Sequence, residues 1–209
     1  MSDVALGHSP KKHVRLSAYR NDRSFTYLLK RFLWSCVQLP FWPKMPRKIS
    51  VLRIALLRAF GAQIGRRCLV ESARIWIPWN LQMDEFSVIG NGAEIYNLAP
   101  VRIGANSVIS QRGYLCTATH AYTKSDFPLY SRPITIGPSV WIAAGVFVGP
   151  GIDVGEGAVV GAYSVVTKDV PPWMVCAGNP CRVIKPRRLD DVNESRTENL
   201  QEPEKAVSR

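Results

Sequence analysis

The chain of 209 residues carries 27 lysines and arginines against 16 acidic residues, a formal net charge of +11 at neutral pH. Its length suits one domain with short appendages, and its hydrophobic content of 46% is enough for a sizeable core. The five cysteines show neither CxxC spacing nor an even count, and no secretory signal peptide precedes them; this excludes a disulfide-stapled secreted protein and predicts reduced thiols in a cytoplasmic protein.

The basic charge is concentrated at the N-terminus. Residues 1–67 hold fourteen lysines and arginines but only two acids, whereas the rest of the chain is close to neutral. Apolar residues at i, i+3, i+4 and i+7 spacing predict an amphipathic helix over Phe25–Val37, ended by the segment Pro40–Pro43. A second helix is predicted over Val51–Phe60, with Ser50 as its N-cap.

Two interpretations fit this basic helical segment, which we define as residues 1–63. The favoured one is a cap over the open end of the repeat domain that follows. The other is a contact of residues 25–60 with an anionic membrane, which places the protein peripherally at the inner face of that membrane. Neither helix is long enough to span a bilayer, and no nucleic-acid-binding module accompanies the basic residues. The membrane interpretation puts Trp34, Phe41 and Trp42 at the interface and turns Lys30, Arg31, Lys44, Arg47 and Lys48 toward the lipid.

A strict six-residue repeat runs from Ile136 to Pro171. Each hexad opens with Ile or Val, and four of the six follow it with Gly: IGPSVW, IAAGVF, VGPGID, VGEGAV, VGAYSV and VTKDVP. This period suits neither a helix nor an alternating strand. It predicts a solenoid of three short strands per 18-residue coil, with the opening residue pointing inward and coils stacked about 4.8 Å apart. The same signature occurs in three earlier sets in other registers. The hexads open at Ile64, Val70 and Trp76, at Ile89, Ile95 and Val101, and at Ile103, Ile109 and Leu115, and these residues are likewise predicted to point inward.

The repeat is interrupted near Pro78–Ser87, at Arg102, and from about Thr119 to Pro133. The first two interruptions are interpreted as surface bulges. The third contains His120, the only histidine outside the extreme N-terminus. A neutral imidazole is well suited to remove a proton from a hydroxyl, although the spacing alone is equally compatible with a surface histidine. Cys116 is an alternative nucleophile, but its hexad position favours a packing role.

Three further segments give the array a specific resemblance. They are Thr117–His120 before a loop, Thr167–Pro172, and Ala177–Lys185 with its Ala-Gly-Asn-Pro motif. With the hexads, they resemble the hexapeptide-repeat O-acetyltransferases, and in particular the WcaF-like branch of colanic acid and exopolysaccharide biosynthesis, from about Leu16 to Lys185. The resemblance implies a mainly β fold, a left-handed parallel β-helix with an N-terminal helical segment. It also implies a homotrimer with its active sites between subunits.

The resemblance further implies a reaction. His120 matches the base that deprotonates the acceptor hydroxyl as this attacks the thioester of acetyl-CoA, in a ternary complex with no acyl-enzyme and no metal. The backbone N–H of Ala144 matches the donor to the developing oxyanion. The positions that match the CoA groove include two cations for the phosphates and small residues beside the pantetheine arm. They are Trp141, Ala144, Gly161, Ala162, Thr167, Lys168 and Arg182.

The acceptor is the least constrained part of this expectation. It is a sugar hydroxyl, on a free sugar, a nucleotide sugar or a lipid-linked glycan. Asn97 is expected to contact it, since an amide offers both a donor and an acceptor. Two candidates could orient His120: Asp126, or a group from another subunit.

Other functions are weighed against this one. The γ-class carbonic anhydrases share the solenoid but need three histidines for zinc, and only His120 lies in the repeats. A non-catalytic scaffold would need neither the histidine segment nor the C-terminal motif. An acetyltransferase for serine or an amino sugar is the main rival. The domain organisation that follows is the basic segment, a β-helix acyltransferase domain over 64–186, and a disordered polar tail over 187–209.

Overall fold

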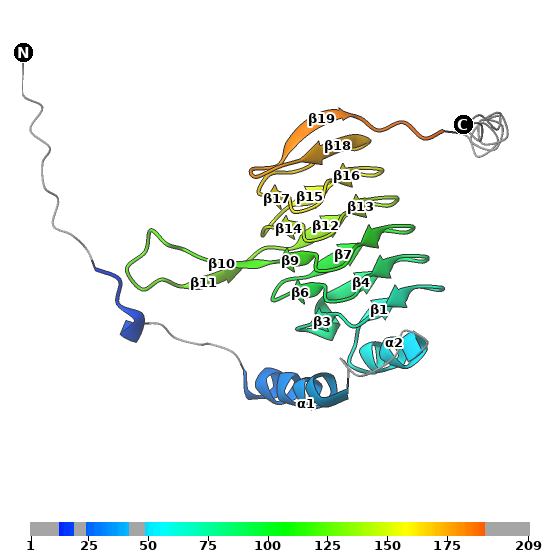
Figure 1. Cartoon of the computed structure of the whole chain (residues 1–209). Helices are drawn as coiled ribbons and strands as arrows, with labels where there is room; N and C mark the ends of the chain where they lie inside the picture. The colour runs from blue at the N-terminus through cyan, green and yellow to red at the C-terminus, as the bar shows by residue number, and fades with distance from the viewer. Residues whose placement is uncertain (1–12, 19–23, 42–48, 191–209) are drawn as a thin grey trace, which may run out of the picture.

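The computed structural model describes residues 13–18, 24–41 and 49–190, and shows a triangular parallel β-solenoid with two helices at one end (Figure 1). Three narrow sheets, here called A, B and C, form its sides. Sheet A contains β1 (Gln63–Ile64), β4 (Leu81–Met83), β7 (Val101–Ile103), β12 (Ile134–Ile136) and β15 (Asp153–Val154). Sheet B contains β2 (Leu69–Val70), β5 (Val88–Ile89), β8 (Val108–Ile109), β13 (Trp141–Ile142), β16 (Val159–Val160), β18 (Met174–Ala177) and the antiparallel β19 (Arg182–Pro186). Sheet C contains β3 (Arg74–Ile75), β6 (Glu94–Tyr96), β9 (Tyr114–Cys116), β14 (Phe147–Val148) and β17 (Val165–Val166).

The core consists of three columns of branched apolar side chains, one behind each sheet. Because successive coils pair in parallel, equivalent residues stack directly on one another, and each is shielded by the coil above and the coil below. Every residue that opens a hexad in the regular array is at most 2% exposed, as the repeat predicts. These residues are Ile136, Ile142, Val148, Val154, Val160 and Val166.

The glycine that follows several of these buried residues has a steric cause. A Cβ atom built on Gly104 would lie 2.5 Å from the backbone nitrogen of Pro138 in the next coil. On Gly155 it would lie 2.5 Å from the nitrogen of Pro172. The Ile-Gly and Val-Gly pairs therefore mark corners where the next coil approaches too closely for any side chain.

The coil length varies along the chain, as the interruptions predict. Ile136 pairs with Val154, 18 residues further on, in the regular part of the array. Ile64 pairs with Met83 after 19 residues, and Met83 with Ile103 after 20, which confirms two short bulges. Ile103 pairs with Ile136 after 33 residues, so this coil carries a long insertion.

Side chains from the two helices, α1 (Phe25–Phe41) and α2 (Ser50–Ala59), bind the exposed backbone edge of the first coil. The Arg58 guanidinium donates to the carbonyl of Ile64, with its Nη2 at 2.6 Å. The indole Nε1 of Trp34, only 1% exposed, donates to the carbonyl of Ile75 at 2.6 Å. Coil edges have unpaired backbone groups, so these donors let the helices cover the end of the solenoid.

The start of α2 differs from the sequence expectation. Its N-cap is Ile49, and no side chain caps the helix. Ser50 is instead buried against the first coil, where its Oγ donates to the carbonyl of Val70 and accepts from the Val70 N–H, both at 3.1 Å. The N-cap prediction for Ser50 was wrong because this hydroxyl serves the strand edge rather than its own helix.

The orientation of α1 also corrects an expectation. The helix ends within the predicted stop segment 40–43, but Trp34 faces the first coil and cannot lie at a membrane interface. Lys30 and Arg31 also turn toward the solenoid, over the rings of Trp79 and Trp76 at 4.4 and 5.1 Å. Trp42, Lys44, Arg47 and Lys48, together with the side chain of Phe41, lie outside the described residues.

Two other expectations shift by a few residues. In the first coil the buried residue of sheet C is Ile75 rather than Trp76, which is only half-buried. Arg187, which the prediction placed in the polar tail, is anchored on the solenoid, since its guanidinium donates to the carbonyls of Ser139 and Gly157 at 2.8 and 2.9 Å. Residues 191–209 lie outside the described part of the chain. No helix that the structure describes is long and apolar enough to cross a membrane.

Candidate active site

The insertion in the third coil forms a β-hairpin arm that leaves the solenoid where sheet C turns into sheet A (Figure 1). We call this turn the C–A corner. The arm consists of β10 (Ala118–His120) and β11 (Leu129–Ser131), paired antiparallel with His120 opposite Leu129. The histidine singled out in the sequence therefore lies on an ordered strand, at the point where the arm begins its turn.

His120 is held by its neighbour across the arm. Its Nδ1 lies 2.8 Å from the carbonyl oxygen of Phe127, and the two rings stack with centroids 4.4 Å apart and an interplanar angle of 12°. A carbonyl can only accept, so in the neutral ring Nδ1 carries the hydrogen and Nε2 keeps its lone pair. The imidazole is only partly buried, which leaves it accessible to a substrate.

Phe127 adopts a backbone conformation that side chains other than glycine rarely take, with φ of +46°. For an L-residue this conformation costs about 1–2 kcal/mol. Here it turns the Phe127 carbonyl back toward the ring of His120. Sequence reasoning had offered Asp126 or another subunit as the orienting group and missed this one, because a main-chain carbonyl leaves no signal in the residue types.

Three of the predicted CoA-lining residues lie at the turn from sheet B to sheet C, the B–C corner. Ala144 follows β13, and Gly161 and Ala162 follow β16 one coil further on. The Ala144 carbonyl accepts from the N–H of Tyr163 at 2.9 Å. Among the described residues no group accepts from the N–H of Ala144, nor from those of Gln111 and Ala162 in the neighbouring coils. The corner thus presents one N–H without a described acceptor in each of three successive coils.

Gly161 has a structural explanation of its own. A Cβ added there would lie 2.8 Å from the Cβ of Ala177 in the next coil. The absence of a side chain at this position is therefore required by coil stacking, whatever ligand lies beside it.

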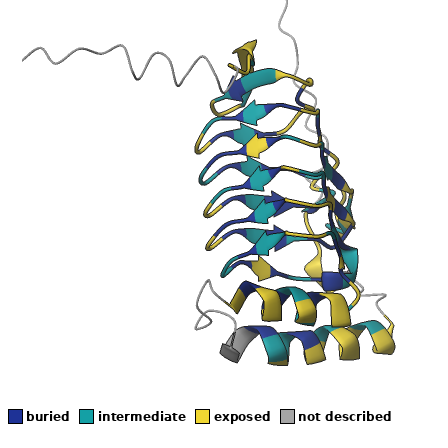
Figure 2. Ribbon diagram, turned by 90° about the vertical axis from the view of Figure 1, so that its right-hand side faces the viewer, coloured by how far each residue is buried: buried dark blue, intermediate teal, exposed yellow. Residues whose placement is uncertain are grey.

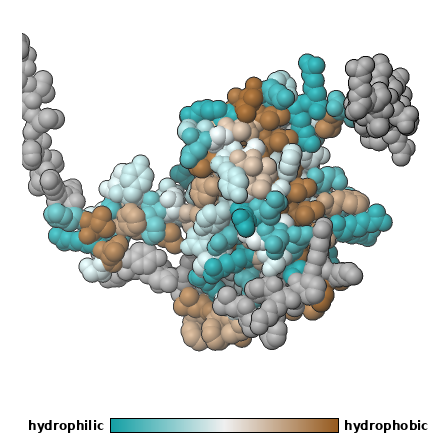
Figure 3. Space-filling model, in the orientation of Figure 1, coloured by the Kyte–Doolittle hydropathy of each residue, from teal (hydrophilic) through white to brown (hydrophobic). Residues whose placement is uncertain are grey.

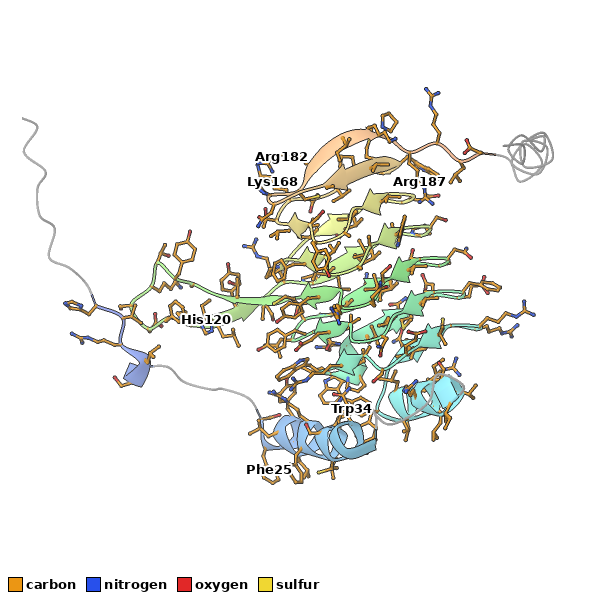
Figure 4. The ribbon with its side chains drawn as sticks, in the orientation of Figure 1. Phe25, Trp34, His120, Lys168, Arg182 and Arg187 are labelled. Carbon is orange, nitrogen blue, oxygen red and sulfur yellow. The ribbon has the colours of Figure 1, made fainter. Side chains whose placement is uncertain are left out.

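Lys168 and Arg182 lie side by side at the far end of the solenoid, on the same side as the arm (Figure 4). They line one shallow pocket of about 290 Å³, together with Cys176 and Cys181. Burial raises the pKa of both thiols, so at neutral pH the two cations face no thiolate there. Thr167, exposed, precedes Lys168 at the C–A corner.

Trp141 stands apart from these residues, on sheet B. The residue is 49% exposed, and its Nε1 donates to the Oγ of Ser110 at 2.9 Å. Of the other predicted residues, Ala144, Gly161 and Ala162 lie at the B–C corner and Thr167 and Lys168 at the C–A corner, while Arg182 begins β19. Within one chain, therefore, the structure groups Lys168 with Arg182 and Ala144 with Gly161, while His120 projects on the arm.

Asn97 does not have the surroundings expected of an acceptor-binding residue. It is fully buried, its Oδ1 accepts from the N–H of Ile77 at 2.9 Å, and its Nδ2 donates to the carbonyl of Ile77 at 2.6 Å. The main-chain carbonyl of Asn97 accepts from the amide of Asn80. As placed, the Asn97 side chain holds the C–A corner together in the coil below the arm, and no part of it reaches the surface to meet a sugar.

Cys116 is also buried, with its Sγ 3.2 Å from the carbonyl of Ala118, which fits the packing role expected of a hexad residue. In the described part of the chain, no group of three or more His, Cys, Asp or Glu residues could hold a metal ion.

Comparison with known proteins places the chain in a family. Residues 133–168 match the model of the bacterial transferase hexapeptide (six repeats). The chain is 41% identical over 160 residues to the "Putative colanic acid biosynthesis acetyltransferase WcaF" of Escherichia coli (strain K12), covering 76% of this chain and 88% of that protein.

Two solved structures extend the likeness to three dimensions. A maltose O-acetyltransferase from Clostridium difficile 630 matches with a TM-score of 0.70 and 31% identity, over 78% of this chain and 89% of its own. A galactoside acetyltransferase in complex with coenzyme A matches with a TM-score of 0.66 and 28% identity, over 80% of this chain and 86% of its own. The expected fold class, a left-handed parallel β-helix with an N-terminal helical segment, is confirmed.

Proposed function

The chain belongs to the hexapeptide-repeat acetyltransferase family, on its WcaF-like branch, and we propose that it transfers the acetyl group of acetyl-CoA to a hydroxyl of a sugar. The observation that carries the proposal is the hydrogen bond between His120 and Phe127, because it leaves Nε2 of a neutral imidazole free to accept a proton. The galactoside acetyltransferase was solved with coenzyme A, and the named activities of the relatives favour a saccharide acceptor.

In the proposed reaction His120 acts as a general base. Nε2 takes the proton of the acceptor hydroxyl while its oxygen forms a bond to the acetyl carbonyl carbon. The bond from that carbon to sulfur then breaks, and the proton passes from the imidazolium to the departing CoA thiolate. Both substrates are present together, so the rate benefits from their alignment and no acyl-enzyme is needed.

The acetyl carbonyl oxygen gains negative charge in this step and needs a fixed donor. The N–H of Ala144 fits this role, since no described group accepts from it at the B–C corner. The neighbouring coils present the same kind of N–H, so the corner geometry supplies the donor. His120 lies on the arm at the C–A corner, so it has to reach the Ala144 N–H at the B–C corner for the reaction to occur.

The donor substrate is proposed to lie along sheet C. Lys168 and Arg182 suit the phosphates of CoA, since both are exposed cations on one pocket. Thr167 lies beside them. The side chains of Gly161 and Ala162 are absent or small, so a pantetheine arm can approach the backbone at the B–C corner. Trp141 would meet the same ligand from sheet B.

We also propose a homotrimer. The outward face of sheet B carries a column of apolar residues in register from coil to coil, which is typical of a self-association surface. The arm, projecting from the C–A corner, suits the delivery of His120 to a neighbour's sheet C. The members of the apolar column are Leu69, Val88, Val108, Trp141, Val159 and Val175.

The test compares two histidine substitutions in acetyl-CoA turnover with a panel of free sugars, nucleotide sugars, lipid-linked glycans, amino sugars and serine. His120→Ala should fold normally and lose about 10²–10⁴-fold in kcat. His13→Ala, which removes an exposed histidine of the N-terminal segment, is the matched control and should retain full turnover. Near wild-type turnover in His120→Ala would overturn the mechanism. Activity found only with serine or an amino sugar would show that one of these, and not the hydroxyl of an ordinary sugar, is the acceptor.

A further inference from the structure

The apolar stripe of α1 faces away from the protein. The helix packs on the first coil through its other side, where Trp34 is buried and Tyr27 meets the ring of Trp79 edge to face at 5.8 Å. Figure 4 shows Phe25 pointing away from the coils and Trp34 pointing toward them. The outward residues are each between 42% and 77% exposed: Phe25, Leu28, Leu29, Phe32 and Leu33.

The second helix adds to this surface. Both helices lie beneath the first coil, at the same end of the solenoid (Figures 1 and 2). Around the start of α2, Ile49, Val51 and Leu52 are 40%, 78% and 45% exposed. Apolar side chains gather at this lower end in the space-filling view (Figure 3). We call the eight exposed residues of the two helices the end plate. So many large apolar side chains on one end of a domain mark a contact surface.

The charge around the end plate narrows the choice of partner. Residues 23–70 contain ten lysines and arginines and no acidic residue. The described contacts of Lys30 and Arg58 are an aromatic ring and backbone carbonyls, which do not neutralise these two cations, whereas the buried Arg53 faces Glu71. A second copy of the end plate would bring the same charge to the contact and be repelled. The complementary partner is apolar and anionic.

We propose that the end plate docks on an anionic lipid bilayer. An apolar helix face in a segment rich in basic residues and free of acids is the pattern of helices that bind anionic membranes. Lys30 and Arg31 lie over Trp79 and Trp76 on the solenoid side of α1, so their charge acts on the lipid from behind the end plate. The end plate is perpendicular to the solenoid axis, so docking would hold the coils upright on the membrane. In the trimer three end plates would face the same side, and three weak contacts would act together.

Docking also deepens the proposed function, on which this step rests, by favouring one acceptor class. A site held at a bilayer surface is best placed for a glycan carried on a lipid. Because the docking surface shares no residue with the proposed acetyl-transfer site, the two can be tested independently.

The test is flotation of the full-length protein with vesicles of phosphatidylcholine, with and without phosphatidylglycerol. Wild type should float with the anionic vesicles, and less so as salt is raised. The double variant Leu29→Ser/Phe32→Ser should float about tenfold less or worse, because it removes two of the exposed apolar side chains. Leu189→Ser, which changes a residue 65% exposed outside the two helices, is the control and should float like wild type.

Melting temperature and acetyl transfer to a soluble sugar should be unchanged in the double variant, because the end plate lies outside the active site. Three results would overturn the docking proposal. They are no flotation of wild type, equal flotation of the double variant, or a concentration-dependent self-association that the double variant abolishes, which would make a second copy the partner. Absence of acetyl transfer by wild type to every acceptor of the panel, lipid-linked glycans included, with flotation intact would instead count against the proposed reaction alone.

Discussion

The Nδ1 atom of His120 lies 2.8 Å from the carbonyl oxygen of Phe127, and the two rings stack across the arm. This pair fixes both the tautomer and the plane of the imidazole without a carboxylate. A base oriented in this way owes its position to the conformation of one strained residue, since Phe127 has a φ of +46°.

Phe127→Ala keeps the carbonyl but removes the ring that stacks on His120. We expect kcat to fall about 10- to 100-fold, because a small misplacement of a catalytic group is costly, while KM for acetyl-CoA stays the same. Phe86→Ala is the matched control, since Phe86 is also a phenylalanine with positive φ, at +59°, but lies on the solenoid away from the arm. Steady-state kinetics of the two variants decides the matter. An unchanged kcat in Phe127→Ala would show that the carbonyl alone positions the base.

Asn97→Ala leaves the main-chain N–H and carbonyl of Ile77 buried without their partner. We expect a loss of about 1–3 kcal/mol in the free energy of unfolding, measured by denaturant titration. Asn91→Ala, in the same coil but with an exposed side chain, should cost far less. A variant of unchanged stability that has a raised KM for the sugar would restore the acceptor-binding role that the sequence suggested for Asn97.

Much of the solenoid follows from sequence because its core is built locally. Ile136, Ile142 and Val148 stand six residues apart, one on each sheet, and each is shielded by the coils above and below, so the period alone reports which way they point. The first coil breaks that rule. There the inward residue of sheet C is Ile75, so the prediction of Trp76 at this place was wrong by one position.

Other features depend on contacts that periodicity cannot encode. The sequence shows the apolar stripe on α1, but it does not show which side of the helix packs against the first coil. The deciding contacts are the bond from Trp34 to Ile75 and the cation–π contacts of Lys30 and Arg31. The same holds for His120, whose place in the sequence pointed to the chemistry while its orienting group is a backbone atom.

Gly161→Ala tests whether coil stacking requires the glycine. The new Cβ would lie 2.8 Å from the Cβ of Ala177, and we expect the free energy of unfolding to fall by about 1–3 kcal/mol. The double variant Gly161→Ala/Ala177→Gly should recover most of that loss, because it removes the opposing atom. The check is a double-mutant cycle of denaturant unfolding. If the second substitution does not restore stability, the clash with Ala177 is not what requires a glycine here, and the requirement comes from the ligand instead.

Arg182→Gln removes one of the two cations on the pocket at the end of the solenoid. We expect KM for acetyl-CoA to rise about tenfold, the effect of one lost charge-assisted contact, with little change in kcat. The difference should shrink as salt is raised, because both cations are exposed and screened. Lys185→Gln, which removes an exposed charge on the same strand without touching this pocket, should leave KM unchanged. Equal effects of the two substitutions would mean that the net charge of the protein, rather than the position of Arg182 beside Lys168, attracts acetyl-CoA.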